Sequence, residues 1–230
     1  MMALFFSVKL VAQNDRLGTW NIVNVQYNFN KKVNAFIENQ FRSQKLFEHF
    51  SYHELKAGVG FNVSDKLSIL LGNGFYQTYS IGGNFKSPVT TSEYRMWEQL
   101  TITNNISRFK VEHRYRAEQR WLPQGFRNRF RYRLNTLLPL NKPSMAKGVL
   151  YAAVFDEIFL TDKSPYFQRN RFFAGLGYQF SKQLILQSGY IRQFDYNLSN
   201  SSAKSYLQTS LLFNIHSGRS DREYHPGAMD

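Results

Sequence analysis

The chain has 230 residues, with 29 Lys and Arg against 16 Asp and Glu, so its formal net charge is +13. Aromatic residues make up 17% of the sequence, which excludes a disordered chain because such chains are poor in aromatics. Disulfide scaffolds, thiolate metal sites and cysteine nucleophiles are also excluded, because the sequence contains no cysteine. No apolar run approaches the ~20 residues that a membrane-spanning helix needs. The mean hydropathy of −0.44 is nevertheless compatible with a membrane barrel, whose strands average an apolar and a polar face.

The first twelve residues, MMALFFSVKLVA, form a short apolar stretch that ends on a small residue. This pattern predicts a truncated or incomplete signal peptide over residues 1–12, with cleavage between Ala12 and Gln13. The basic start of such a signal is missing, so an ordinary N-terminal extension is the alternative. A signal peptide would direct the protein out of the cytoplasm.

A period of two dominates residues 17–215. Here we count eleven segments of roughly 11 to 15 residues in which polar and apolar residues alternate, as in strands with two different faces. In chain order, three early examples cover residues 33–42, 54–63 and 93–102. The pattern therefore predicts a series of long β-strands.

The alternation is clearest in residues 109–121 and 126–134. Their charged side chains all fall on one face, at Lys110, Glu112, Arg114, Arg116, Glu118, Arg120, Arg127, Arg129, Arg131 and Arg133. A helix would distribute these side chains around its circumference, whereas a strand places them on one side. Residues 169–180 repeat the pattern, but the two segments 149–160 and 184–196 leave the facing of their side chains ambiguous.

The connections between the segments differ in length. Turns such as residues 30–32 and 181–183 are short, and stretches such as residues 45–51 and 80–92 are longer. This rhythm is typical of outer-membrane barrels, and the segments suit a tilted bilayer crossing of ~9–11 residues. We therefore predict an all-β fold over residues 13–215, an antiparallel transmembrane (outer-membrane) β-barrel of 10–12 strands. Twelve strands are preferred over eleven because closed barrels of this kind have even strand numbers.

A soluble β-sandwich is the alternative fold, with the apolar face buried and the arginines in water. Two features favour the barrel. The segments are longer than the ~5–6 residues typical of strands in globular sheets. The apolar face also carries aromatic residues near the strand ends, as interfacial girdles do. These residues are Trp20, Tyr79, Trp121, Phe126 and Tyr196.

In a barrel, the polar face would line the lumen. The candidate site is therefore a lumen charge network made of Glu38, Arg42, Arg95, Glu98, Glu112, Arg114, Arg116, Glu118, Arg120, Arg127, Arg129, Arg131, Arg133, Glu157, Arg169 and Arg171. With Lys56, Lys110, Glu54 and Glu93, the polar face holds thirteen cations and seven anions. An Arg–Glu ladder would fill a narrow barrel and hold its strands in register. The alternative is an open, anion-attracting pore, and the surplus of arginine is the one observation that the ladder does not explain.

Several segments in order resemble a known family. They include EYRMWEQL, then HRYRAEQRW followed by FRNRFRYRL, and then FQRNRFFAGLGYQF. Together they resemble the domain-of-unknown-function family 2490, a set of secreted, barrel-forming proteins of Bacteroidota-type outer membranes. The markers are the R-x-R-x-E-Q-R strand at residues 114–120, the R-x-R-x-R strand after it, and the Q-R-N-R run at residues 168–171. The resemblance covers residues 17–215 and implies a fold and a location, but no activity.

The five histidines offer little chemistry. His49 and His53 lie four residues apart, but in a loop that enters a strand and without the His-Glu-x-x-His order of a metal site. His113 is the only candidate base at mid-membrane height for a lipid-acting enzyme, and no serine lies near it in the sequence. We therefore predict no catalytic residue, no metal and no cofactor.

The function predicted from the sequence is that of a structural or accessory outer-membrane barrel, or a subunit of a larger outer-membrane assembly. A narrow anion-preferring channel and a lipid-acting enzyme are the alternatives. The expected partners are outer-membrane lipid and other outer-membrane proteins, which would contact the barrel exterior or a flexible, periplasmic tail at residues 216–230. We expect no nucleic-acid partner, because a stacking platform needs arginines and aromatics on the same face. The expected location is the outer membrane of a Gram-negative cell, reached through the signal peptide.

Overall fold

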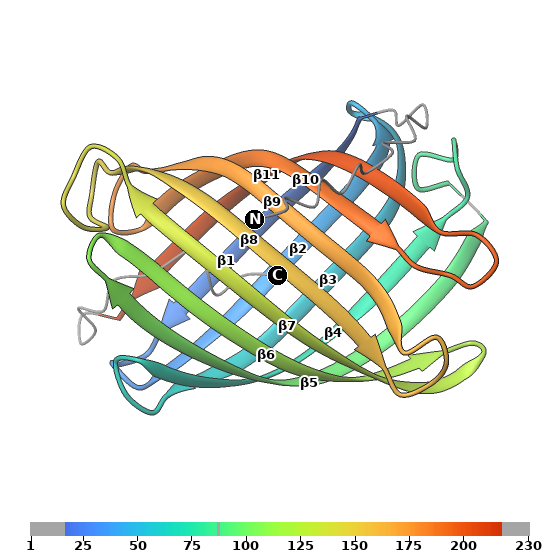
Figure 1. Cartoon of the computed structure of the whole chain (residues 1–230), viewed down its shortest axis with the longest axis horizontal. Coiled ribbons are helices and arrows are strands. Elements are labelled where there is room, and N and C mark those ends of the chain that lie inside the picture. Colours follow the sequence, from blue (N-terminus) through green and yellow to red (C-terminus); the bar gives the residue numbers. More distant parts are fainter. Residues whose placement is uncertain (1–16, 87, 218–230) are drawn as a thin grey trace, which may run out of the picture.

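The computed structural model describes residues 17–86 and 88–217, which form a closed barrel of eleven β-strands (Figure 1). The strands are β1 Gly18–Asn28, β2 Val33–Lys45, β3 Glu48–Asn62, β4 Leu67–Tyr79, β5 Val89–Ile106, β6 Phe109–Leu122, β7 Gly125–Pro139, β8 Leu150–Thr161, β9 Phe167–Gln179, β10 Leu184–Asp195 and β11 Ser202–His216. The all-β barrel is therefore confirmed. The predicted signal peptide and the tail beyond residue 217 lie outside the described residues. Within those residues there is no helix long and apolar enough to cross a membrane.

Neighbouring strands pair in chain order, and every pair but one is antiparallel. The exception closes the barrel: β1 pairs with β11 in parallel, from Gly18 opposite Tyr206 to Asn28 opposite His216. With an odd number of alternating strands, the first and the last run in the same direction, so their pairing must be parallel. The preference for twelve strands is wrong because it assumed that every pair is antiparallel. His216 also belongs to β11 rather than to a tail.

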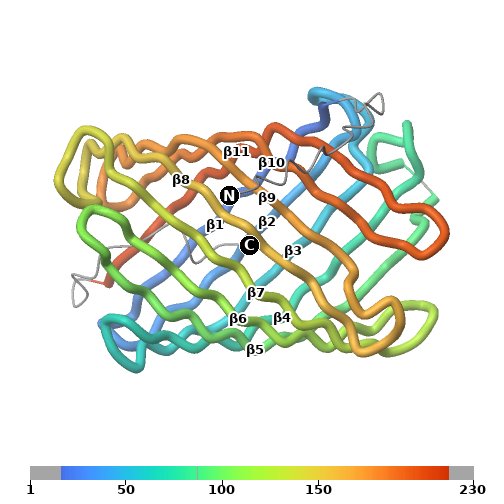
Figure 2. The backbone as a smooth tube through the Cα atoms, viewed as in Figure 1, coloured from blue at the N-terminus to red at the C-terminus, as the bar shows by residue number. Residues whose placement is uncertain are grey.

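The strands are tilted and wind around the barrel axis, which lies horizontally in Figure 2. We refer to the end at which β1 begins as end A, on the right of the picture, and to the other as end B. The longest connections are residues 80–88 at end A and residues 140–149 at end B. The predicted long connection at residues 45–51 is wrong, because only two residues separate β2 from β3. Loop length therefore does not distinguish the two ends.

Side chains alternate between the interior and the outer wall, as the period of two predicts. On β6, Arg114, Arg116 and Glu118 are buried. Tyr115, which lies between the two arginines, and Trp121, which lies farther along the strand, are exposed. Forty large apolar side chains are exposed among the described residues. The outer wall is therefore apolar over much of its area, and the interior holds most of the charge.

Part of the interior is apolar. A cluster of buried residues includes Ile22, Leu137, Tyr151, Ala153, Phe155, Phe173, Ile185, Ile191 and Leu212. Met145 and Val149, in the connection at end B, belong to the same cluster, so this loop packs against the barrel interior. Trp20 is also inside and only 1% exposed, so its assignment to an outer aromatic girdle is wrong. Gly177 makes room for this packing: a Cβ there would lie 2.1 Å from Tyr151 Cζ.

Candidate functional site

The barrel interior brings together eleven buried cations and six buried carboxylates. The cations are Arg42, Lys56, Arg95, Lys110, Arg114, Arg116, Arg120, Arg129, Arg131, Arg133 and Arg171. The carboxylates are Glu38, Glu54, Glu93, Glu112, Glu118 and Glu157. Among the described buried residues, positive charge therefore exceeds negative charge by five. Thirteen of the sixteen residues proposed from the sequence lie in this buried set.

Glu157 on β8 is the first centre of the network. Its Oε1 atom lies 2.6 Å from Arg114 Nη2 and 2.8 Å from Arg131 Nη2, and its Oε2 atom lies 2.8 Å from Arg133 Nη2. Arg171 on β9 is farther away, with 3.9 Å between Nη1 and Oε2. Glu157 is fully buried, so one carboxylate ties β6, β7 and β8 together inside the barrel.

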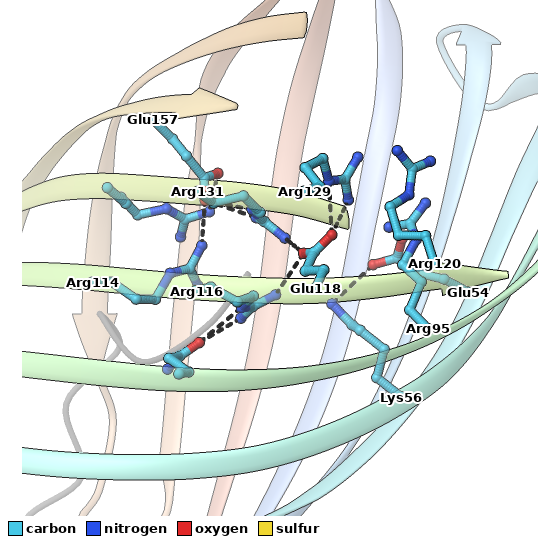
Figure 3. A network of polar contacts seen from close by, with 12 residues as sticks. Glu54, Lys56, Arg95, Arg114, Arg116, Glu118, Arg120, Arg129, Arg131 and Glu157 are labelled. Atoms are coloured by element: carbon cyan, nitrogen blue, oxygen red, sulfur yellow. Dashed lines mark hydrogen bonds and ion pairs between the residues drawn. The ribbon is translucent and has the colours of Figure 1, made fainter. Parts of the chain in front are cut away.

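Glu118 on β6 is the second centre. It accepts hydrogen bonds from Arg129 Nε at 2.7 Å and from Arg131 Nη1 at 2.7 Å. Arg131 thus bridges Glu118 and Glu157, as Figure 3 shows. Arg116 on the same strand donates to Gln99 Oε1 at 2.7 Å and 3.0 Å, through Nη2 and Nε, which links β5 to the network.

A third group of ion pairs lies on β2 and β3. Lys56 pairs with Glu38 and, at 2.9 Å, with Glu54. Arg42 Nη2 lies 3.3 Å from Glu54 Oε2. Because charge-assisted pairs of this kind connect neighbouring strands at fixed positions, they suit the role of holding strands in register.

A fourth group lies toward end A, around Glu93 on β5. Arg95 donates to both carboxylate oxygens of Glu93 at 2.7 Å, through Nε and Nη2. Arg120 also donates to both oxygens, with 3.1 Å between Nη2 and Oε2. One carboxylate therefore serves two guanidinium groups.

Aromatic rings take up part of the positive surplus. The guanidinium of Arg42 lies 3.4 Å from the Trp20 ring centroid and 4.2 Å from that of Tyr52, and Arg95 lies 3.6 Å from that of Tyr76. Four guanidinium carbons lie 4.6 to 5.7 Å from the centroid of the Phe159 ring. They belong to Arg129, Arg131, Arg169 and Arg171. A cation within about 6 Å of a ring centroid is attracted to the negative face of the ring. The sequence interpretation missed these rings because it placed the aromatic residues on the strand face opposite to the arginines.

Three of the proposed residues lie elsewhere. Glu98 is on the outer wall, where it accepts a hydrogen bond from Gln119 Nε2 at 3.0 Å, so its assignment to the lumen is wrong. The reason is Trp97, which is 1% exposed and occupies the inward position between Arg95 and Gln99. Arg127 is exposed near end A.

Arg169 is half-buried at end A, where it forms an ion pair with Asp195. Asp195 was not among the residues proposed from the sequence. Its strand, β10, was one of the segments whose facing the sequence left ambiguous. The acidic side chain at its last position was the available signal, because the antiparallel pairing of β10 with β9 places it opposite Arg169.

Two cavities lie at opposite ends of the interior. The cavity at end A has a volume of about 290 Å³ and is lined by residues that include Arg42, Arg95 and Arg120. The cavity at end B, of about 450 Å³, is lined by residues that include Lys110 and Met145. The two share no lining residue. The buried groups around Glu118 and Glu157, together with the apolar cluster, occupy the interior between them.

His53 and His113 lie outside this network. His113 is on the outer wall, and its Nδ1 atom lies 2.9 Å from the Tyr132 hydroxyl. His53 Nε2 lies 2.9 Å from Asn39 Oδ1, also on the outer wall. In residues 17–86 and 88–217, no three His, Asp or Glu side chains come together in an arrangement that could hold a metal ion.

Comparison with known protein families gives a match over most of the chain. The model of a family described as "Protein of unknown function (DUF2490)" matches residues 17–204, which include β1 to β10 and the first residues of β11. No curated protein matches the chain, and no solved structure does.

Proposed function

The chain belongs to the DUF2490 family, and from this premise we propose that it is a non-conducting transmembrane barrel of a Gram-negative outer membrane, with a structural or accessory role. Its partners would be outer-membrane lipid and other outer-membrane proteins. The proposal assigns it no catalytic residue and no cofactor.

The outer wall carries the proposal. Soluble monomers rarely expose contiguous apolar patches larger than a few hundred Å². Here 28 of the forty exposed large apolar side chains lie on the strands of the described barrel. Aromatic rings cluster at end A, where the Trp121 centroid lies 5.6 Å from that of Tyr94 and 5.4 Å from that of Phe126. At end B, Tyr27 and Phe29 form a similar pair at 4.9 Å. Aromatic girdles at both ends of an apolar wall are typical of membrane barrels.

The filled interior supports the non-conducting part of the proposal. Arg114 and Glu157 are at most 1% exposed, and Leu137, Tyr151 and Phe173 of the apolar cluster are equally buried. Conduction needs a continuous water-filled path, and ion pairs and apolar packing between the end cavities oppose one. The surplus of five buried cations favours a narrow anion channel as the second candidate.

His113 on the outer wall is the candidate base for the alternative function, a lipid-acting enzyme. A lipid-acting site needs a base beside a nucleophile. The ring nitrogen of His113 meets the Tyr132 hydroxyl, and the two rings are stacked with 6.2 Å between centroids. This contact favours a structural role for His113, as a side chain that packs against Tyr132, over a role as a catalytic base.

A matched pair of arginine substitutions tests the membrane location. Leu55 lies on the outer wall in the middle of β3, opposite Asn39 and Phe75, and is 42% exposed. Leu198 lies in the connection between β10 and β11 and is 72% exposed. Arginine at the bilayer midplane costs ~2–4 kcal/mol, but near the interface ~0–1 kcal/mol. Leu55→Arg should therefore reduce the yield of folded barrel in lipid vesicles severely, and Leu198→Arg should not.

Folding is measured as a heat-modifiable band on a gel, together with co-flotation of the protein with vesicles. The parent protein should float with the vesicles and show the band. The proposal fails if the parent folds in plain buffer and stays in solution when vesicles are added. Equal yields for the two arginine variants would also contradict it, because a water-exposed wall treats both positions alike.

A further inference from the structure

The cavity at end A, which we call the vestibule, is strongly basic. The cations in its lining are Arg42, Arg95, Arg120, Arg129, Arg169 and Lys204. The only carboxylates among its lining residues are Glu93 and Asp195. Arg42 and Arg129 pair with Glu54 and Glu118, which lie just outside the lining, so the six cations exceed the carboxylates around them by two.

Acceptors in the vestibule are shared or missing. Glu93 serves both Arg95 and Arg120, although each guanidinium carries five N–H donors. Arg42 Nε is buried without a hydrogen-bond partner. Lys204 is exposed and forms no ion pair with any residue in the described ranges. The vestibule therefore offers donors to a ligand that supplies several oxygen acceptors.

The arginines of the vestibule are held in place before any ligand arrives. Arg42 lies between the rings of Trp20 and Tyr52, and Arg95 lies against Tyr76. Asp195 is bound by Arg169 and by Gln193 Nε2, the latter at 2.7 Å. Donors that are already ordered lose less conformational entropy when they bind, which favours affinity.

We propose that the vestibule binds the phosphate group of a small phosphorylated ligand, of about the size of a sugar phosphate. Planar guanidinium forks match the geometry of phosphate, and several of them can surround its oxygens. The volume of about 290 Å³ is just below the range for ligand pockets, roughly 300–1,000 Å³, which suits only a small ligand. Tyr206 and Gln168 in the lining offer a hydroxyl and an amide group for the rest of it.

This binding site is independent of the proposed membrane function, because it depends only on residues of the interior. The test uses the full chain folded in detergent micelles and isothermal titration calorimetry. The probes are inorganic phosphate, glucose 6-phosphate, glucose and a short-chain phosphatidic acid. The first two should bind and glucose should not, and phosphatidic acid shows whether the same site takes the phosphate of a lipid.

Two variants locate the site. The double substitution of Arg169→Gln with Lys204→Gln should raise the Kd for glucose 6-phosphate at least tenfold. Lys182→Gln removes an exposed charge from the turn at end B and should leave the Kd unchanged. The heat-modifiable band verifies that each variant is folded before titration.

The titrations separate the possible sources of the phosphate. Binding of glucose 6-phosphate that depends on Arg169 and Lys204 supports a soluble ligand. Binding of phosphatidic acid alone, with the same dependence, supports a lipid headgroup at the same phosphate site. The proposal is overturned if no phosphate compound binds the folded parent protein, or if Lys182→Gln weakens binding as much as the double substitution.

Discussion

Glu157→Gln is the most informative single change in the interior. The substitution keeps the size of the side chain and removes its charge from the centre of four arginines. One oxygen remains as an acceptor, but the other becomes an NH₂ group that faces guanidinium donors. If the amide oxygen stays toward Arg114 and Arg131, the new NH₂ group takes the place of Oε2, which lies 2.8 Å from Arg133 Nη2. Two hydrogen-bond donors would then face each other.

The expected loss follows from the burial of the carboxylate. Removing one partner of a buried ion pair costs about 3–5 kcal/mol, because the remaining charges stay buried without compensation. The retained acceptor still serves two arginines, so the lower end of this range applies. A loss of about 3 kcal/mol would reduce the folded-to-unfolded ratio on the order of a hundredfold.

The assay is equilibrium unfolding by urea of the barrel in lipid vesicles, followed by tryptophan fluorescence and by gel mobility. Glu48→Gln is the matched control, because it makes the same chemical change in an exposed ion pair with Lys45 at end A and should shift the free energy of unfolding by less than about 1 kcal/mol. Equal free energies of unfolding for Glu157→Gln and the control would refute the account of the interior as an ion-paired core.

Two further predictions concern packing and a loop. Gly177→Ala should lower the free energy of unfolding by about 1–3 kcal/mol, measured by the same urea titration, because the new Cβ would overlap the buried ring of Tyr151. Unchanged stability would mean that this ring can move away. The pKa of Asp162, between β8 and β9, is lowered by hydrogen bonds from the side chain and backbone of Asn128. Since the folded-state pKa of Asp162 is below the unfolded one, this contact stabilises the loop at neutral pH and is lost as the pH falls below about 4. An NMR titration should show a higher Asp162 pKa in the Asn128→Ala variant than in the parent protein. An equal pKa in the two proteins would contradict the assignment.

The strands were predictable because the two faces of the wall differ so strongly. On β6 and β7, every inward position from Lys110 to Arg120 and from Arg129 to Arg133 is charged, so alternation alone identifies the faces. The rule fails where the interior also takes apolar residues. Trp97 faces inward between two polar positions, and the polarity pattern therefore assigned Glu98 to the lumen.

The partners of the arginines could be predicted only in part. Carboxylates on the same strands, such as Glu118, were visible in the alternation. The role of Phe159 was not, because a ring becomes a partner only when the closed barrel brings β7 and β9 beside it. The alternation also indicated eleven segments, which matches the eleven strands. The preference for twelve arose because the parallel pairing of β1 with β11 joins residues that are far apart in the chain, and no local pattern encodes it.

The central claim is that the barrel spans a membrane with a filled interior. Single-channel recording of the folded protein in planar lipid bilayers tests it most directly, with insertion verified by antibody access or by fluorescence of a labelled chain. The account predicts that inserted protein gives no stepwise current at any applied voltage that the bilayer tolerates. Regular steps with a reversal potential that indicates anion preference would contradict it and would favour the channel instead.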